Sequence, residues 1–375
     1  MNAWEELVAR CARRRNEKIG PLSDEAYAEL VLAVRQSPAD FVDEPPEQAL
    51  LVLARALDAY RASLSHDDAL DDDAFEAERR RRLAALRAEC ERAAGVDAGC
   101  LDARLVALLA SELDPDRLLD ALLGLERSHP APEPPAGDAW DDVLYRPHLR
   151  LRAAVARVCL DGARYRMAAS AAASVEDATP DDPLGARHTH MLACARLEDE
   201  AALGALEARW SGRESAWSHL ARVLLLYKLG RLTAARRALR GFDCLVTGGA
   251  YALLRPVFVE PFLPDRPEAP SCGFEEALMA VREAEPIIAD VPEFVRGGRG
   301  PVGRGAGPRG WAARAGVAGP RAGAPLSGLL GPSRPLLDVL LAGLLAGLLA
   351  GLLAECTKLS SGFLEILSIS LSYLT

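Results

Sequence analysis

Apolar residues recur at helical spacing along most of the chain before residue 296. Two segments about 67 residues apart share one arrangement, a glycine-containing turn followed by apolar residues at i, i+3, i+7 and i+10. The residues are Tyr165, Ala168, Ala172 and Val175 in the first, and Leu232, Ala235, Leu239 and Phe242 in the second. The separation is about twice the ~34-residue period of a two-helix repeat. The pattern therefore predicts an all-α chain, an α-α superhelix of stacked helical hairpins.

Helical patterns also precede and follow these hairpins. Residues 3–36 predict two helices, with Ser23 capping the second, and further helices are predicted at 45–60, 74–94, 100–110 and 115–127. The Pro-rich stretch that follows cannot continue a helix. The chain is thus divided into an N-terminal helical region (1–127), a Pro-rich linker (128–139), TPR-like repeats (140–247), a C-terminal capping segment (248–295), a Gly/Arg/Pro-rich disordered linker (296–335) and a hydrophobic low-complexity tail (336–375).

The repeat region resembles the tetratricopeptide repeat (TPR) family over about 100 of the 375 residues. One unit matches at Ala163-Arg-Tyr165, Ala168, Ala172 and Pro180; another matches at Trp217, Leu220, Gly230-Arg-Leu232, Ala235 and Phe242. Between them a unit without the glycine places Ala202 34 residues after Ala168. The pattern also fits an α-α superhelix outside this family. The resemblance implies a scaffold or adaptor whose groove binds a peptide or helix of another protein.

The matched positions are packing positions, so they name no partner. Exposed side chains near the turns and on the third unit are the expected partner contacts; they are Arg164, Tyr165, His219, Tyr227 and Arg231. Residues 248–295 are expected to cap the end of the stack, with Tyr251, Phe258 and Phe262 packing on the last hairpin. A helix at Phe274–Glu285 is expected to stop at Pro286.

Charge bears on the kind of partner. Residues 296–375 carry seven Arg, one Lys and three acids, a net charge of +5. The whole chain has a net charge of −10, so residues 1–295 carry −15. An acidic body favours basic segments and makes nucleic acid an unlikely ligand. The eight cysteines form no Cys-x-x-Cys pair, and residues 1–20 do not read as a signal peptide. The expectation is a cytoplasmic protein with free thiols, among which Cys159 and Cys244 are core residues.

The last 80 residues differ in composition from the rest. Residues 296–335 contain twelve Gly, six Pro and no acid, which indicates a disordered linker, with RNA contact as the alternative. Leu336 to Ala354 repeats Leu-Leu-Ala-Gly and is long enough to span a bilayer. The chain could therefore be anchored in a membrane by this segment. Asp338 and the exact repetition favour instead an out-of-frame or fused tail that selection did not shape.

No catalytic, cofactor-binding or metal-binding residue is predicted. His190 and Cys194 share a helix face and His188 lies near them, but a second ligand pair is missing. The acidic run Asp67–Asp73 lacks the glycine of a calcium loop and suits the start of a helix. Nucleotide-binding, serine-hydrolase and zinc-protease motifs are absent. The expectation is a non-catalytic protein, with an unrecognised enzyme as the remaining alternative.

Overall fold

The computed structural model describes residues 1–65, 70–255 and 258–289. Within these ranges it contains fourteen α-helices, one short 3-10 helix and no strand, which confirms the all-α class. The proposed linker at 296–335 and the tail at 336–375, including Leu336 to Ala354, lie outside the described residues.

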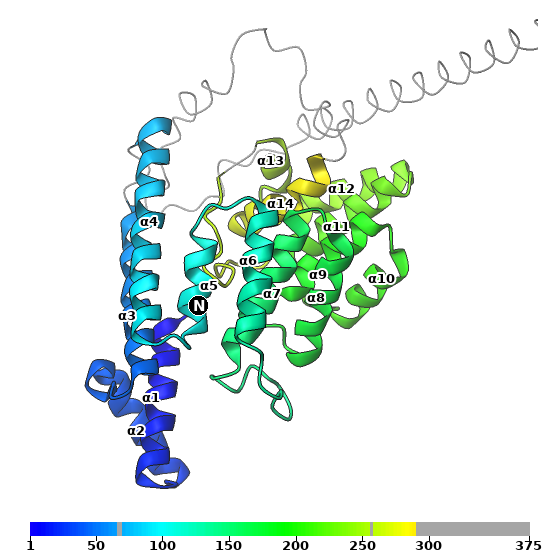
Figure 1. Cartoon of the computed structure of the whole chain (residues 1–375). Coiled ribbons are helices and arrows are strands. Elements are labelled where there is room, and N and C mark those ends of the chain that lie inside the picture. Colours follow the sequence, from blue (N-terminus) through cyan, green and yellow to red (C-terminus); the bar gives the residue numbers. More distant parts are fainter. Residues whose placement is uncertain (66–69, 256–257, 290–375) are drawn as a thin grey trace, which may run out of the picture.

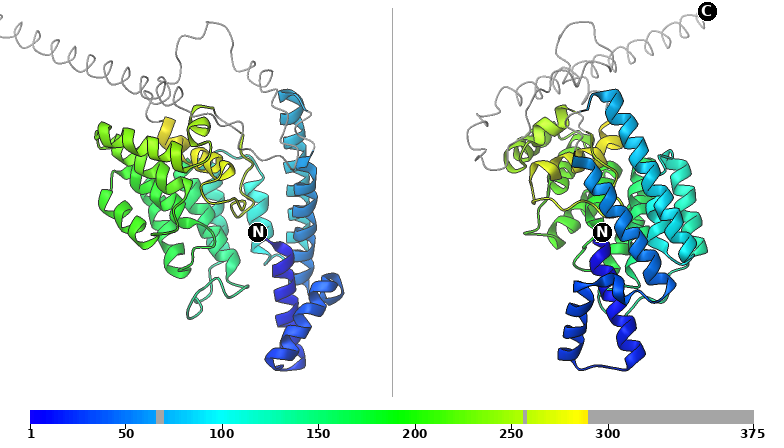
Figure 2. Two further views of the ribbon diagram at one scale, coloured as in Figure 1. Left: turned by 180° about the vertical axis from the view of Figure 1, so that it is seen from behind. Right: turned by 90° about the vertical axis from the view of Figure 1, so that its left-hand side faces the viewer.

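The first four helices form a layer beside the hairpins (Figures 1 and 2). They are α1 (Ala3–Ile19), α2 (Asp24–Gln36), α3 (Pro45–Ser63) and α4 (Asp72–Val96), with the 3-10 helix η1 (Pro38–Phe41) after α2. The predicted cap is present, because the Ser23 side chain accepts a hydrogen bond from the Ala26 N–H. Asp71 caps α4 in the same way, so the described end of the acidic run, Asp71 to Asp73, begins a helix. Leucines of α1, α3 and α4 form the core of this layer.

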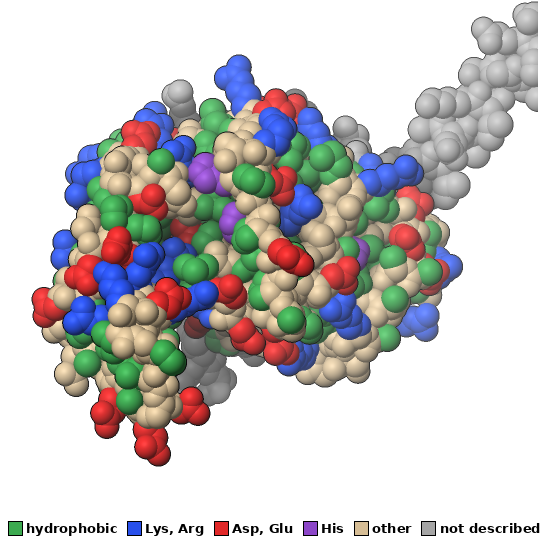
Figure 3. Space-filling view, turned by 60° about the horizontal axis from the view of Figure 1, so that its bottom comes forward, with side chains coloured by type: hydrophobic (Ala, Val, Ile, Leu, Met, Phe, Trp, Pro, Cys, Tyr) green, Lys and Arg blue, Asp and Glu red, His purple; other side chains and the backbone are tan. Residues whose placement is uncertain are grey.

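Four helical hairpins follow and share a second, larger core. They are α5 (Leu101–Leu109) with α6 (Pro115–Ser128), α7 (Arg146–Asp161) with α8 (Tyr165–Ala178), α9 (Ala186–Leu197) with α10 (Glu200–Arg209), and α11 (Ala216–Lys228) with α12 (Leu232–Leu245). Consecutive hairpins pack on one another through α6 and α7, α8 and α9, and α9 and α11. Charged and apolar side chains alternate over the face shown in Figure 3.

The last three hairpins use the same turn. Ala163, Glu198 and Gly230 each have positive φ, at 57°, 61° and 69°. The next N–H in each turn donates to the carbonyl five residues earlier, with N···O distances of 2.7, 3.0 and 3.0 Å. This is the helix-ending geometry in which a left-handed residue lets the chain reverse while satisfying the last carbonyls. The middle unit therefore makes the turn without glycine.

This turn fixes which residues of the second helices correspond. In each turn, the carbonyl of the residue after the left-handed position accepts the first hydrogen bond of the second helix. The donors are the N–H groups of Ala168, Leu203 and Ala235. Leu203, which is fully buried, is thus the counterpart of Ala168. The sequence register that paired Ala202 with Ala168 is wrong by one residue, because the glycine that would have marked the turn is replaced by Glu198.

The C-terminal segment does more than follow the last hairpin. Helix α13 (Gly249–Leu254) packs on α12, but α14 (Phe274–Ala289) packs on α7, α9 and α11. We call the faces of these three helices that contact α14 the inner face. Helix α14 continues through Pro286 to Ala289, contrary to the expected stop. Phe258 contacts the Phe75 ring of α4 at 5.1 Å between centroids, so it packs against the N-terminal layer and not on the last hairpin.

A buried ion cluster connects the N-terminal layer to the hairpins. Arg150 of α7 is 1% exposed and contacts the carboxylates of Glu6, Asp102 and Asp265, which come from α1, α5 and the segment before α14. Arg150 also lies over the Trp140 ring. Since an isolated buried charge is costly, each member of this cluster depends on the others to remain inside.

Candidate functional site

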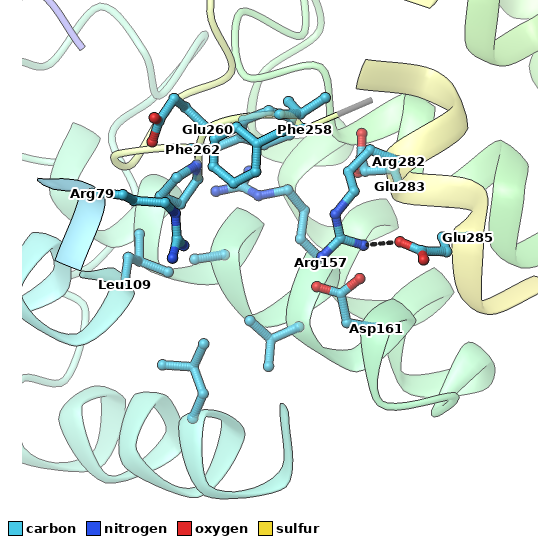
Figure 4. Close-up of a pocket in the computed structure, with 15 residues that line it drawn as sticks. Arg79, Leu109, Arg157, Asp161, Phe258, Glu260, Phe262, Arg282, Glu283 and Glu285 are labelled. Atoms are coloured by element: carbon cyan, nitrogen blue, oxygen red, sulfur yellow. Dashed lines mark hydrogen bonds and ion pairs between the residues drawn. The ribbon is translucent and has the colours of Figure 1, made fainter. Parts of the chain in front are cut away.

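A cavity of about 530 Å³ opens between the N-terminal layer, the first hairpins and the C-terminal segment (Figure 4). Helix α7 supplies Arg157 and Asp161, and α14 supplies Arg282 and Glu285 on the opposite side. Most of the remaining wall is apolar and consists of Leu109, Leu118, Ala154, Val158, Phe258, Val259, Pro261 and Phe262. An apolar cavity of this size with a few converging polar groups has the general character of a ligand site.

The wall formed by α14 is held by a buried polar network. Glu283 accepts hydrogen bonds from Thr189 (3.0 Å), from the Trp217 indole N–H (2.7 Å) and from Arg266 (2.6 and 2.9 Å). Although burial opposes ionisation, Arg266 keeps the pKa of Glu283 below its usual value. His188 stacks on Trp217 with 4.2 Å between ring centroids. Helix α14 is thus fixed on the inner face, and the cavity lies beside it, next to the C-terminal turns of α7.

Arg157 is the buried cation of the cavity. Its side chain is 8% exposed, lies over the Phe262 ring and donates one hydrogen bond of 2.6 Å to the Pro264 carbonyl. Burial and the positive charge of Arg266 lower its pKa to about 10. Among the described residues no carboxylate lies within ion-pair distance of it. Guanidinium has five N–H donors, so most of the donor capacity of Arg157 remains available.

Asp161 lies one helical turn after Arg157 and is the matching acid. Its side chain reaches solvent, yet the protein atoms around it raise its pKa to about 6, with Arg282 and Arg157 opposing the rise. No hydrogen bond or ion pair connects it to another described residue. At neutral pH, Asp161 therefore presents an unpaired, solvent-accessible carboxylate to the cavity.

The other charged groups of the lining already have partners. Arg282 pairs with Glu285 at 2.7 Å, Arg79 pairs with Glu112, and Glu283 pairs with Arg266. Glu260 accepts a hydrogen bond of 2.6 Å from the Tyr60 hydroxyl. Arg157 and Asp161 are consequently the two lining groups whose charge a ligand could complement.

The same lining bears on catalysis. Its described residues include no Ser, Thr, Cys or His, so the groups it offers for chemistry are carboxylates and guanidinium groups. Asp161, with a pKa near neutrality, is the lining group suited to proton transfer.

The partner contacts expected from the sequence lie elsewhere, and none of them lines this cavity. Arg164 pairs with Asp116 of α6, and Arg231 pairs with Glu200 of α10, each at 2.6 Å. Tyr165 lies beneath the Arg196 guanidinium. His219 and Tyr227, both on α11, are half-buried. The two arginines therefore hold equivalent places, each linking its turn to the second helix of the preceding hairpin.

The histidines and cysteines singled out in the sequence have separate environments. His188 is buried against Trp217, whereas His190 contacts Glu176 at 2.8 Å and bonds the Cys194 side chain. In the described part of the chain, no three His, Cys, Asp or Glu side chains gather as metal ligands would. Cys159 is buried as expected, but Cys244 is exposed, so its expected place in the core is wrong.

The sequence analysis missed Arg157 and Asp161. Their signal is a charged pair at i and i+4 in the second half of α7, where the other residues from Ala153 to Leu160 are apolar and buried. That pattern indicates charged side chains near the core. It does not predict the cavity, because residues about 100 positions later complete its wall.

No helix in the described ranges has the length and apolar character needed to cross a bilayer. Comparison with family models, with curated proteins and with solved structures gives no match for this chain.

Proposed function

We propose that this chain is a non-catalytic scaffold or adaptor that binds a segment of another protein in the cavity beside α7. The observation that carries the proposal is Arg157, a buried guanidinium that lines an apolar cavity and has no carboxylate partner among the described residues. Burying such a charge is costly unless a partner group compensates for it.

The architecture supports a TPR-like reading of the hairpins. Three successive turns have the same backbone geometry, and their hairpins stack in order. The inner face already holds a helix, α14, so its shape suits a helical or extended segment. The proposed α-α superhelix would thus present a groove that α14 fills along α7, α9 and α11 and leaves open at the cavity.

The side chains that line the cavity indicate which residue types the bound segment contains. Arg157 already donates to the backbone carbonyl of Pro264, and its other N–H groups suit a carboxylate of an incoming chain. The unpaired carboxylate of Asp161 favours a lysine or arginine side chain. Phe258, Phe262 and Leu118 suit apolar side chains. A net basic, amphipathic segment that also carries a carboxylate for Arg157 fits these features and the net acidic charge of residues 1–295.

Site-specific photo-crosslinking in cells tests the proposal. A benzophenone amino acid replaces Phe258, which lines the cavity and is 46% exposed. The matched control replaces Leu32 on α2, which is 56% exposed and lies outside the cavity. We expect a discrete protein adduct from position 258 alone, and we expect Leu118→Trp, which fills the cavity, to abolish it. An adduct that persists in a folded Leu118→Trp protein, or that forms equally at position 32, contradicts the proposal.

Location is a separate part of the proposal. The seven cysteines of the described residues are free thiols, which suits a reducing compartment such as the cytoplasm. The alternative, a membrane tether formed by Leu336 to Ala354, is tested by imaging the whole chain and residues 1–295 with the same fluorescent tag. Equal cytoplasmic distribution opposes the tether, and membrane localisation of the whole chain alone supports it.

A further inference from the structure

Three arginines form a basic stripe on the last helix of the hairpin array. Arg236, Arg237 and Arg240 of α12 make no hydrogen bond or ion pair with any residue that the structure describes, and Arg237 and Arg240 are exposed. At ~100° per residue the three side chains lie within about 100° of one another around the helix axis. They therefore share one side of α12 within little more than one turn.

Most arginines that the structure describes contact a carboxylate, and the three of the basic stripe do not. Two acids of the preceding hairpin are engaged with other arginines: Glu200 pairs with Arg231, and Glu207 pairs with Arg222. Asp243 lies on the same side of α12, but it is turned toward the start of α13, where it accepts a hydrogen bond from the Ala250 N–H. The three arginines of the basic stripe thus form no ion pair among the described residues, and the acids named here are engaged elsewhere.

The preceding hairpins provide an internal control for this feature. Counting from the equivalent residues Arg164, Asp199 and Arg231 of the three turns, the stripe positions are five, six and nine residues later. The corresponding residues are Ala169, Ser170 and Ala173 on α8, and Gly204, Ala205 and Ala208 on α10. The fold accepts small neutral residues at all six places, so packing does not require arginine there.

The position of α12 leaves the basic stripe accessible. Helix α12 packs on α11 and α13, and no described hairpin follows it in the stack. Figures 1 and 2 show α12 at the edge of the molecule farthest from α1–α4. A partner could reach this side without displacing α14 or entering the cavity.

We propose that the basic stripe on α12 is a docking surface for an acidic segment of another protein. Guanidinium groups bind carboxylates through paired, charge-assisted hydrogen bonds, and three of them within ~6 Å of helix rise suit three closely spaced Glu or Asp side chains. A nucleic acid is a poorer match. Its charges extend far beyond the basic stripe and would meet the net −15 of residues 1–295.

The test is direct binding to the full chain, measured by fluorescence anisotropy. The probe is a labelled synthetic helical peptide with Glu at i, i+1 and i+4; the comparison ligands are the same peptide with Gln at those positions and a single-stranded DNA of equal charge. The variant is Arg236→Ala/Arg237→Ala/Arg240→Ala. The matched control is Arg55→Ala/Arg127→Ala/Arg166→Ala, which removes three exposed arginines, also unpaired among the described residues, from three separate helices.

We expect the Glu peptide to bind the parent and the scattered-arginine control equally, and to bind the stripe variant about tenfold more weakly. Added salt should reduce this binding, and the Gln peptide should not bind. The proposal is overturned if the two triple variants lose affinity equally, if the Gln peptide binds as well as the Glu peptide, or if no binding occurs. Preferential binding of the DNA at the basic stripe would assign that surface to nucleic acid instead.

Discussion

The indole N–H of Trp217 donates a hydrogen bond of 2.7 Å to the carboxylate of Glu283, which joins α11 to α14. Both side chains are buried, and the same carboxylate receives Arg266 and Thr189. The contact of α14 with the inner face therefore depends on a charged network as well as on apolar packing.

Glu283→Ala should lower the free energy of unfolding by about 3–5 kcal/mol, because it leaves the nearly buried Arg266 without its carboxylate. Urea denaturation followed by circular dichroism measures this loss. The control is Glu285→Ala, which removes an exposed carboxylate two residues away and should change stability by less than about 1 kcal/mol. Equal effects of the two substitutions would mean that the network around Glu283 does not hold α14.

The repeated turn predicts effects of opposite sign at two equivalent residues. Gly230→Ala should destabilise the protein by about 1 kcal/mol, because a Cβ is sterically unfavourable in the left-handed backbone conformation. The new Cβ would meet no neighbouring atom, so the effect would come from the backbone alone. Ala163→Gly should be neutral or stabilise by up to about 1 kcal/mol. Thermal unfolding of both variants checks this, and a loss of stability in Ala163→Gly would contradict the equivalence.

Asp161 gives a pH-dependent prediction. Its folded pKa of about 6 is above its unfolded value, so protonation stabilises the folded state, and this contribution disappears as the pH rises from about 4 through 6. Asp161→Asn should therefore raise the melting temperature at pH 7 and change it little at pH 4. If the substitution instead lowers stability at pH 7, Asp161 has a stabilising partner and is not available to a ligand.

The protonation of His190 should affect stability at a higher pH than that of Asp161. Burial opposes its protonation, but bonds to Cys194 and Glu176 outweigh burial and raise its pKa to about 9. The stabilisation is complete below the unfolded pKa of about 6.5 and is lost as the pH rises through about 9. NMR titration of the imidazole should show this raised value, and His190→Gln should remove the corresponding pH dependence of stability. A normal imidazole titration near 6.5 would rule out the buried ion pair.

The local helical structure could be predicted from the sequence because it follows from local periodicity. Ser23 and the acidic run ending near Asp73 were sufficient to locate two helix starts, and the second helix of each clear hairpin was identified from its apolar spacing. The middle hairpin was placed one residue out because Glu198, which has no special preference for positive φ, makes its turn.

The candidate site could not be predicted because its contacts are distant in sequence. Arg157 and Asp161 become the unpaired charges of a cavity only after residues 258–262 and α14 fold back against α7. Whether Pro286 ends a helix likewise depended on packing: Ile287 is fully buried, so the last turn is held by its contacts despite the missing N–H.

The ion cluster around Arg150 has a consequence for how the molecule unfolds. Its members come from α1, α5, α7 and the segment before α14, so separating the N-terminal layer from the hairpins would strand a buried cation and three carboxylates. Despite the prolines between α6 and α7, residues 1–289 should melt as one cooperative unit. Differential scanning calorimetry should show a single transition for the parent, and Arg150→Met, which removes the cation that joins the two layers, should lower or split it.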